Sequence, residues 1–198
     1  MSATYADASR TLLRDTVLDA VGELLADRTW GEVNMTEVAA RAGVSRQTLY
    51  NAFGSRHALA QAYVSREADR FLVTVEAAVR ESGGDARGAI AAAMEIFLAA
   101  AESHPLVRAI SASDTGDELL ALVTTRGGPV LESVIGGLSE LIGEQWPQIP
   151  APKARAVAET MVRLGISHAA LPSDTPRRTA GTVAELLGPH LDELVAAA

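Results

Sequence analysis

Side chains suited to DNA recognition gather in one short segment of this chain. Arg46, Gln47 and Asn51 follow one another closely, and the stretch from Val38 to Arg66 holds four arginines and no acidic residue. The chain as a whole carries 25 Asp and Glu among 198 residues. Arginine can form two hydrogen bonds with the edge of guanine, and glutamine or asparagine can do so with adenine. These residue types therefore indicate contacts with bases in a DNA major groove.

Two short helices joined by a tight turn would have to position these side chains. We expect Thr36 to cap the first helix, and Gly43 to end it in a left-handed conformation. Ser45 then caps a second helix, Arg46 to Phe53, and Gly54 with Ser55 starts a long helix that reaches about Glu81. This is the layout of a helix-turn-helix, whose second helix enters the major groove.

The helical period divides the second helix into two faces. Leu49 and Phe53 are apolar and must face the interior. The face toward solvent then carries Arg46, Gln47, Thr48 and Asn51. The same period exposes Tyr50, with a partly buried tyrosine as the alternative. An ordinary polar helix face has the same pattern, and which side chain contacts which base stays open.

The composition favours an all-α protein. Hydrophobic residues make up 48% of the chain and aromatic residues 4%, and alanine and leucine supply much of the apolar content. The net charge of −8 requires any DNA contact to come from a local basic patch. No cysteine is present, so disulfides and thiolate metal sites are excluded, and we expect neither a metal nor a cofactor. We find no signal peptide or membrane span, and expect a soluble, cytoplasmic protein.

The rest of the chain is also patterned as helices. The turn at Ser82–Asp85 is the clearest boundary. Expected helices lie over 9–28, 85–103, 106–111, 117–126, 129–146, 153–171 and 175–195, with a polar loop at 111–116 and a break at Gly127-Gly128.

The helix-turn-helix segment resembles the TetR family of bacterial transcriptional regulators. The pattern runs Val38-Ala-Ala-Arg-Ala-Gly-Val-Ser45, then Thr48-Leu-Tyr50, then Phe53-Gly-Ser-Arg-His-Ala-Leu59. The resemblance implies a three-helix DNA-binding domain over 1–58, and a helical domain over 59–198 that binds an effector and forms the dimer. Three positions depart from the family: Ala52 replaces a histidine or tyrosine that contacts phosphate, Arg56 replaces a lysine, and Thr29-Trp30 replaces a glycine and an aromatic residue.

The resemblance and the helix starts together predict which residues contact DNA. Tyr50 resembles the family tyrosine that bonds a phosphate. Thr36, Ser45 and Arg56 lie at helix starts, where free amides favour an anion, although capping alone would also explain them. The expected DNA contacts are Thr36, Ser45, Arg46, Gln47, Thr48, Tyr50, Asn51 and Arg56.

Two apolar stripes near the end of the chain point to a dimer. They comprise Val157, Met161, Leu164, His168 and Leu171, and then Val183, Leu187, His190, Leu191 and Leu194. Both resemble the two-helix surface that forms a four-helix bundle in TetR-like dimers, and intramolecular core is the alternative. A two-fold dimer would also reach successive major grooves roughly 34–36 Å apart.

An effector pocket is expected among the middle helices. An apolar cavity there would suit a hydrophobic effector, although plain core explains each residue equally well. The pocket residues we expect are Met94, Phe97, Leu98, His104, Leu122, Trp146 and Met161.

The sequence thus predicts a ligand-responsive repressor that binds a palindromic operator as a homodimer. The long helix to Glu81 is expected to be the only element joining the two domains. No nucleotide-binding, metalloprotease or nucleophile-elbow motif occurs, so an enzyme is not expected. The alternative is a helical protein-interaction module that has lost specific DNA binding, which the acidic charge and Ala52 favour.

Overall fold

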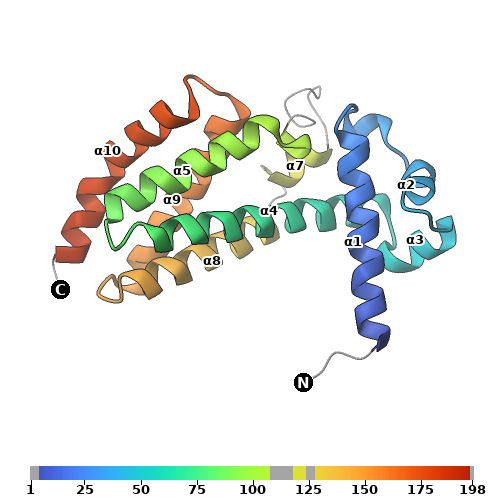
Figure 1. Cartoon of the computed structure of the whole chain (residues 1–198), viewed down its shortest axis with the longest axis horizontal. Helices are drawn as coiled ribbons and strands as arrows, with labels where there is room; N and C mark the ends of the chain where they lie inside the picture. Colours follow the sequence, from blue (N-terminus) through green and yellow to red (C-terminus); the bar gives the residue numbers. More distant parts are fainter. Residues whose placement is uncertain (1–4, 108–117, 124–127, 197–198) are drawn as a thin grey trace.

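The computed structural model describes residues 5–107, 118–123 and 128–196, and these residues form helices and turns without a strand (Figure 1). The all-α prediction is confirmed. The elements are α1 (Tyr5–Leu25), the 3-10 helix η1 (Trp30–Glu32), α2 (Met35–Arg41), α3 (Arg46–Phe53), α4 (Arg56–Glu81), α5 (Ala86–Ser103), α7 (Glu118–Val123), α8 (Gly128–Gln145), α9 (Ala151–Ala170) and α10 (Pro176–Ala196).

The predicted helices match these bounds closely where the structure describes them. Helix α3, the second helix of the expected helix-turn-helix, spans Arg46–Phe53 as predicted. Helix α4 begins at Arg56, directly after its cap Ser55. The first helix starts four residues earlier than predicted and ends three earlier, at Leu25. The end of the predicted 106–111 helix, the polar loop at 111–116 and Gly127 lie outside the described residues.

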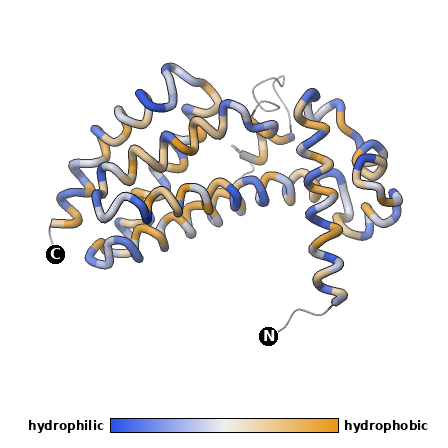
Figure 2. The backbone as a smooth tube through the Cα atoms, viewed as in Figure 1, coloured by the Kyte–Doolittle hydropathy of each residue, from blue (hydrophilic) through white to orange (hydrophobic). Residues whose placement is uncertain are grey.

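The molecule has two ends joined by α4 (Figure 1). Helices α1, α2 and α3 pack together at one end, and α4 runs from them into a bundle with α5, α8, α9 and α10. Helix α10 packs on α5, whereas α9 packs on α8 and also contacts α5. Hydrophobic and hydrophilic residues alternate along the helices, as expected of elements buried on one side (Figure 2).

Each end of the molecule is stabilised by its own hydrophobic cluster. The first joins α1, η1, α2 and α3 to the beginning of α4, and it also includes Leu106, Leu119 and Leu122. The second fills the bundle between α4, α5, α8, α9 and α10. Because α7 supplies two residues to the first cluster, the prediction that α4 alone joins the two domains is wrong.

One predicted helix cap is also wrong. Asn34, not Thr36, caps α2: its side chain accepts hydrogen bonds from the amides of Thr36 and Glu37, at 3.0 and 3.1 Å. Glu37 in turn accepts from the Asn34 amide, which completes a capping box. Thr36 therefore lies in the first turn of α2, where its side chain is exposed.

No helix in the described ranges is long and apolar enough to cross a membrane.

Candidate DNA-binding and ligand-binding sites

Local interactions define both ends of the recognition helix α3. The Ser45 hydroxyl accepts from the Thr48 amide at 3.0 Å, so the predicted cap is confirmed. Gly43 has φ +68° in the turn before α3, and Gly54 has φ +77° directly after it. Residues with a Cβ resist this conformation, so glycine sets the angle at which the chain enters and leaves α3.

The two faces of α3 are as the period predicted. Leu49 is fully buried and Phe53 nearly so, which fixes the inner face. Arg46, Gln47 and Asn51 are exposed. The Gln47 amide donates to the Asn51 side-chain oxygen at 2.8 Å, so these two side chains are held together on the outer face.

Tyr50 and Arg46 extend this outer face. Tyr50 is 39% exposed, which is more than a core tyrosine would be. Among the described residues no carboxylate lies within ion-pair distance of Arg46, whereas Arg41 on α2 pairs with Glu23 at 3.2 Å. The Arg46 guanidinium is therefore free to meet an anion or a base edge.

Three other predicted contact residues lie at helix starts near this face. Ser45 and Thr36 are exposed, at the starts of α3 and α2. Thr48 is half-buried, and its hydroxyl lies 2.8 Å from that of Ser45. Both hydroxyls thus already share a hydrogen bond within the first turn of α3.

Arg56 is held by contacts with Trp30, Val33 and Glu118. Its guanidinium donates to the backbone carbonyls of Trp30 and Val33 and stacks over the Trp30 ring, 4.3 Å from its centre. It also pairs with Glu118 at 2.9 Å. These contacts hold the charged group against η1 and α7, so the structure gives Arg56 an internal role that its position at a helix start did not reveal.

Glu118 is a site residue that the sequence analysis missed. Its carboxylate accepts from Trp30 Nε1 at 2.7 Å and from Arg56 Nη1, and its other oxygen lies 2.6 Å from His57 Nδ1. Burial raises the pKa of Glu118, but the bonds from Trp30 and His57 and the Arg56 charge outweigh this effect and lower the pKa overall. The carboxylate is therefore charged at neutral pH.

Arg14 of α1 is a second missed residue. It donates to the Ala52 carbonyl at 2.8 Å, and its guanidinium lies 4.5 Å from the centre of the Phe53 ring. The last carbonyls of a helix lack partners within the helix, and a cation beside them is favourable. Arg14 thus fixes the end of α3, but no local sequence pattern links it to that helix.

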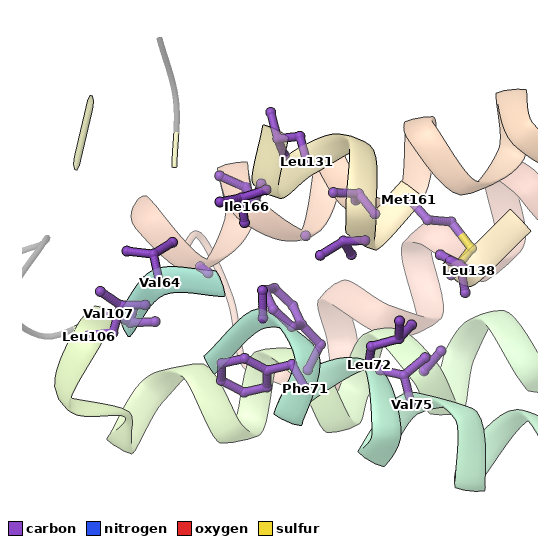
Figure 3. A pocket seen from close by; sticks show the side chains of 18 of the residues that line it. Val64, Phe71, Leu72, Val75, Leu106, Val107, Leu131, Leu138, Met161 and Ile166 are labelled. Carbon is purple, nitrogen blue, oxygen red and sulfur yellow. The ribbon is translucent and has the colours of Figure 1, made fainter. Parts of the chain in front are cut away.

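A cavity of about 180 Å³ lies in the bundle, between α4, α5, α8 and α9 (Figure 3). Phe71, Leu72 and Val75 of α4 line one side, facing Leu131 of α8 and Ile166 of α9. The described residues that line it are all apolar: Val64, Ala68, Phe71, Leu72, Val75, Ala93, Met94, Phe97, Leu106, Val107, Leu122, Val130, Leu131, Val134, Leu138, Met161, Val162, Gly165, Ile166, Ala169 and Ala170. These side chains fit a hydrocarbon, and none of those in the described part of the chain offers a charge to a polar ligand.

Four of the predicted pocket residues line this cavity, namely Met94, Phe97, Leu122 and Met161. Leu98 does not, and borders instead a second hollow at the start of α10, near His168 and Thr179. The α4 residues were missed because their apolar positions on a long amphipathic helix look like ordinary core.

Trp146 and His104 are corrections to the predicted pocket. Trp146 is buried and donates from Nε1 to the Gly84 carbonyl at 3.1 Å, so it closes the turn between α4 and α5. His104 lies behind the cavity wall, where its Nε2 is 3.0 Å from Glu67. Its ring packs against that of Phe71 at an angle of 51°, with centres 4.9 Å apart.

Glu67 is the buried charge behind the cavity wall. It is 3% exposed and pairs with Arg66 at 2.8 Å and Arg70 at 3.2 Å, besides His104. Burial raises the pKa of Glu67. The hydrogen bond from His104 and the charges of both arginines outweigh this effect, so the pKa lies below its ordinary value. The carboxylate is thus a stable anion within the fold.

This network extends to α1. Arg66, which bonds Glu67, also pairs with Asp19 of α1 at 2.8 Å. On the other side, the Leu106 amide donates to His104 Nδ1 at 3.2 Å, so the ring proton on Nε2 is the one that faces Glu67. The cavity wall and the end formed by α1, α2 and α3 are therefore connected by polar contacts as well as by α4.

The two predicted dimer stripes are partly buried inside one chain. The intramolecular interpretation holds for Val157, Met161, Val183 and Leu191, which belong to the bundle core. Leu186 of α10 and the stripe residue Leu171, which directly follows α9, are strongly exposed. The periodicity alone did not separate the inner from the outer apolar positions.

Comparisons with known proteins cover both ends of the chain. Residues 17–63 match the family model of bacterial regulatory proteins of the tetR family, and residues 85–189 match that of the bacterial tetracycline repressor C-terminal domain. The chain is 36% identical over 188 residues to the HTH-type transcriptional regulator AlkX of Mycobacterium tuberculosis, covering 95% of this chain and 89% of that protein.

Solved structures of TetR-family regulators have a fold similar to that of this chain. The TetR family repressor AlkX from a Dietzia strain, implicated in biodegradation of n-alkanes, is 36% identical with a TM-score of 0.80, covering 92% of this chain and 96% of that one. A TetR-family regulator from Pectobacterium atrosepticum is 17% identical with a TM-score of 0.67, covering 97% of each chain, and shows the shared fold.

Proposed function

Because the chain belongs to the TetR family of bacterial transcriptional regulators, we propose that it is a repressor released from a palindromic operator by a hydrophobic effector. The apolar cavity is the observation that carries this proposal. Helix α4 lines the cavity and begins directly after α3. A ligand that binds one position of α4 more tightly than another would therefore change how α3 is presented to DNA.

The DNA contacts that we propose lie on the outer face of α3. Arg46, Gln47 and Asn51 would contact bases, and Tyr50 the phosphate backbone. Thr36, Ser45 and Thr48 would add backbone contacts at the starts of α2 and α3. Arg56, which has partners inside the chain, would support the domain rather than contact phosphate directly. Acting on DNA, the protein would work in the cytoplasm.

We propose that the operator is bound by a homodimer formed through the outer faces of α9 and α10. A single α3 makes few contacts, whereas two related by a two-fold axis can enter successive major grooves. Leu171 and Leu186 are exposed apolar side chains on or next to these two helices, and burying them would favour association.

We propose an unbranched alkyl compound as the effector class. The lining of the cavity is hydrocarbon apart from the sulfur of its methionines, so it favours a chain without polar groups at that depth. The 36% identity with a repressor implicated in n-alkane biodegradation supports the same class.

Operator binding tests the first half of the proposal. DNA from the upstream region of the gene, or a sequence selected from a random pool, would be titrated with protein across a salt series and followed by fluorescence anisotropy. We expect tight binding that weakens steeply with salt, because phosphate contacts release counterions. Arg46→Ala should cost about 1–3 kcal/mol of binding free energy. Arg80→Ala, which removes an exposed arginine near the C-terminal end of α4, is the matched control.

Effector release tests the second half. Dodecane, 1-dodecanol and dodecanoic acid would be added to the protein–operator complex. We expect at least one of them to weaken operator binding, and Val134→Phe, which fills the cavity, to abolish the response. Ser133→Phe adds the same side chain on the exposed face of α8 and should respond normally. If none of the three compounds changes operator affinity, the proposed effector class is wrong; binding that ignores both sequence and salt would favour a protein-interaction module.

A further inference from the structure

Helix α7 touches both the DNA-binding end and the cavity. Its first residue, Glu118, bonds the segments that flank the helix-turn-helix. One turn later, Leu122 is 1% exposed and lines the cavity. Leu119 and Leu122 are both buried in the hydrophobic cluster that includes α1, α2 and α3. A single turn of helix thus separates a cavity-lining side chain from a charged contact with the DNA-binding domain.

Glu118 holds the helix-turn-helix from both sides. Trp30 belongs to η1, which precedes α2, whereas Arg56 and His57 open α4, which follows α3. All three side chains converge on the same carboxylate, within 2.6–2.9 Å. The position of α2 and α3 relative to the bundle therefore depends on where α7 places this carboxylate.

Arg56 makes the arrangement sensitive to charge. Its guanidinium already bonds two carbonyls and stacks on Trp30, so it ties η1 to α4. Glu118 supplies the negative charge that this partly buried cation needs. A shift of α7 would leave the cation without that partner, and the Trp30–Arg56 pair would have to rearrange.

We propose that Glu118 is a positioning residue for the helix-turn-helix, and that α7 transmits changes at the cavity to it through Leu122 and Glu118. A residue pair at i and i+4 lies on one face of a helix, so a displacement of Leu122 moves Glu118 with it. The proposal rests on the proposed function, in which the cavity holds the effector. It adds a second route beside α4, and it assigns that route to named side chains.

A double-mutant cycle on operator affinity tests the proposal without any effector. Leu122→Ala enlarges the cavity at α7, and Glu118→Gln keeps the shape of the side chain while removing its charge. We expect Leu122→Ala to change the operator Kd by at least about threefold when Glu118 is present, and by much less in the Glu118→Gln background. Equal effects in the two backgrounds, or no effect in either, would overturn the proposal.

Met161→Ala is the matched control. Met161 also lines the cavity, but it lies on α9 and belongs to the bundle cluster. Its effect on Kd should add to that of Glu118→Gln, because the two sites share no partner. Coupling of Glu118 to Met161 as strong as to Leu122 would show a general loss of stability, and would contradict a route through α7.

Trp30 provides a signal that a merely structural role of Glu118 would not produce. Trp146→Phe leaves Trp30 as the only tryptophan. Because Leu122 and Trp30 share a hydrophobic cluster, the emission is compared with and without the Glu118 charge. Leu122→Ala should shift the Trp30 emission when Glu118 is present and much less with Glu118→Gln, whereas Met161→Ala should not shift it. An unchanged spectrum with Leu122→Ala would overturn the proposal. If Leu122→Ala does not fold, Leu122→Val serves in both measurements.

Failure of this inference and failure of the proposed function can be told apart. The cycle uses only the protein and its operator, so its result does not depend on whether an alkyl compound releases DNA. An additive cycle with a working effector would leave the repressor proposal intact and remove α7 from its mechanism.

Discussion

At the scale of single residues, Arg56 has a different role in the structure from the one that the sequence predicted. Arg56 was expected to contact phosphate because it lies at a helix start. In the fold it stacks on Trp30 and pairs with Glu118. A guanidinium has five donors, and two carbonyls and a carboxylate already occupy several of them. Its positive charge thus stabilises a contact between elements.

Substitutions of Ser45 can separate its role as a helix cap from a contact with DNA phosphate. Aspartate is as good a helix cap as serine, but it carries a negative charge that would face the DNA backbone. We predict that Ser45→Asp keeps the melting temperature near that of the original chain and weakens operator binding at low salt. Ser45→Ala should instead lower stability by about 1 kcal/mol.

Thermal unfolding and anisotropy titrations would measure the two effects side by side. Unchanged operator affinity with Ser45→Asp would mean that Ser45 only caps α3 and makes no phosphate contact.

At the scale of elements, α4 connects the cavity to α3, and its contacts with α1 and α5 depend on a buried charge. Glu67 on α4 joins Arg66, Arg70 and His104, and Arg66 reaches Asp19 on α1. Removing the Glu67 carboxylate would leave the partly buried Arg66 and His104 without this acceptor, which is costly, although both arginines keep Asp19 as a partner. The network therefore fixes the rotation of α4 about its axis.

Glu67 should make the fold sensitive to acid. Its folded pKa lies below the ordinary value of 4.5, so its stabilising effect is complete above that value and is lost as pH falls through the lower folded pKa. We predict that Glu67→Gln lowers the free energy of unfolding by about 1–3 kcal/mol near neutral pH, and by less in acid.

Urea unfolding between about pH 3 and pH 7 would measure both proteins. Other carboxylates, Glu118 among them, also have lowered pKa values, so the difference between the two proteins isolates Glu67. A difference that stayed constant over the whole range would contradict the ionised state that we assign to Glu67.

At the scale of the whole molecule, the outer faces of α9 and α10 are where two subunits would meet. Leu186 is 73% exposed on α10, although it is a large apolar side chain. We predict that Leu186→Glu dissociates the dimer, because an unpaired charge buried in an interface costs about 3–5 kcal/mol. Operator affinity should fall with it, since two linked α3 helices bind DNA together.

Val73→Glu is the matched control for this substitution. Val73 is 66% exposed on α4, which is not part of the proposed interface. Analytical ultracentrifugation should show a dimer for Val73→Glu and a monomer for Leu186→Glu. A dimer in both cases would place the interface elsewhere.

The sequence alone determined the helical fold and the recognition helix. The Ser45 cap, Gly43 and the Leu49–Phe53 spacing are local signals, which act between residues within a turn or two of each other. Such signals specify α3 whatever the rest of the chain does. Both the exposed face of α3 and its bounds could therefore be predicted.

Only the tertiary structure decided which of the remaining apolar and charged residues meet. Trp30 and Glu118 are 88 residues apart, and no periodic pattern links them. The cavity likewise needs α4, α5, α8 and α9 to be brought together, and an apolar residue that lines a cavity has the same pattern as one in a filled core. Trp146 and Val157 were misplaced for this reason: periodicity shows that a side chain is buried, and packing decides against what.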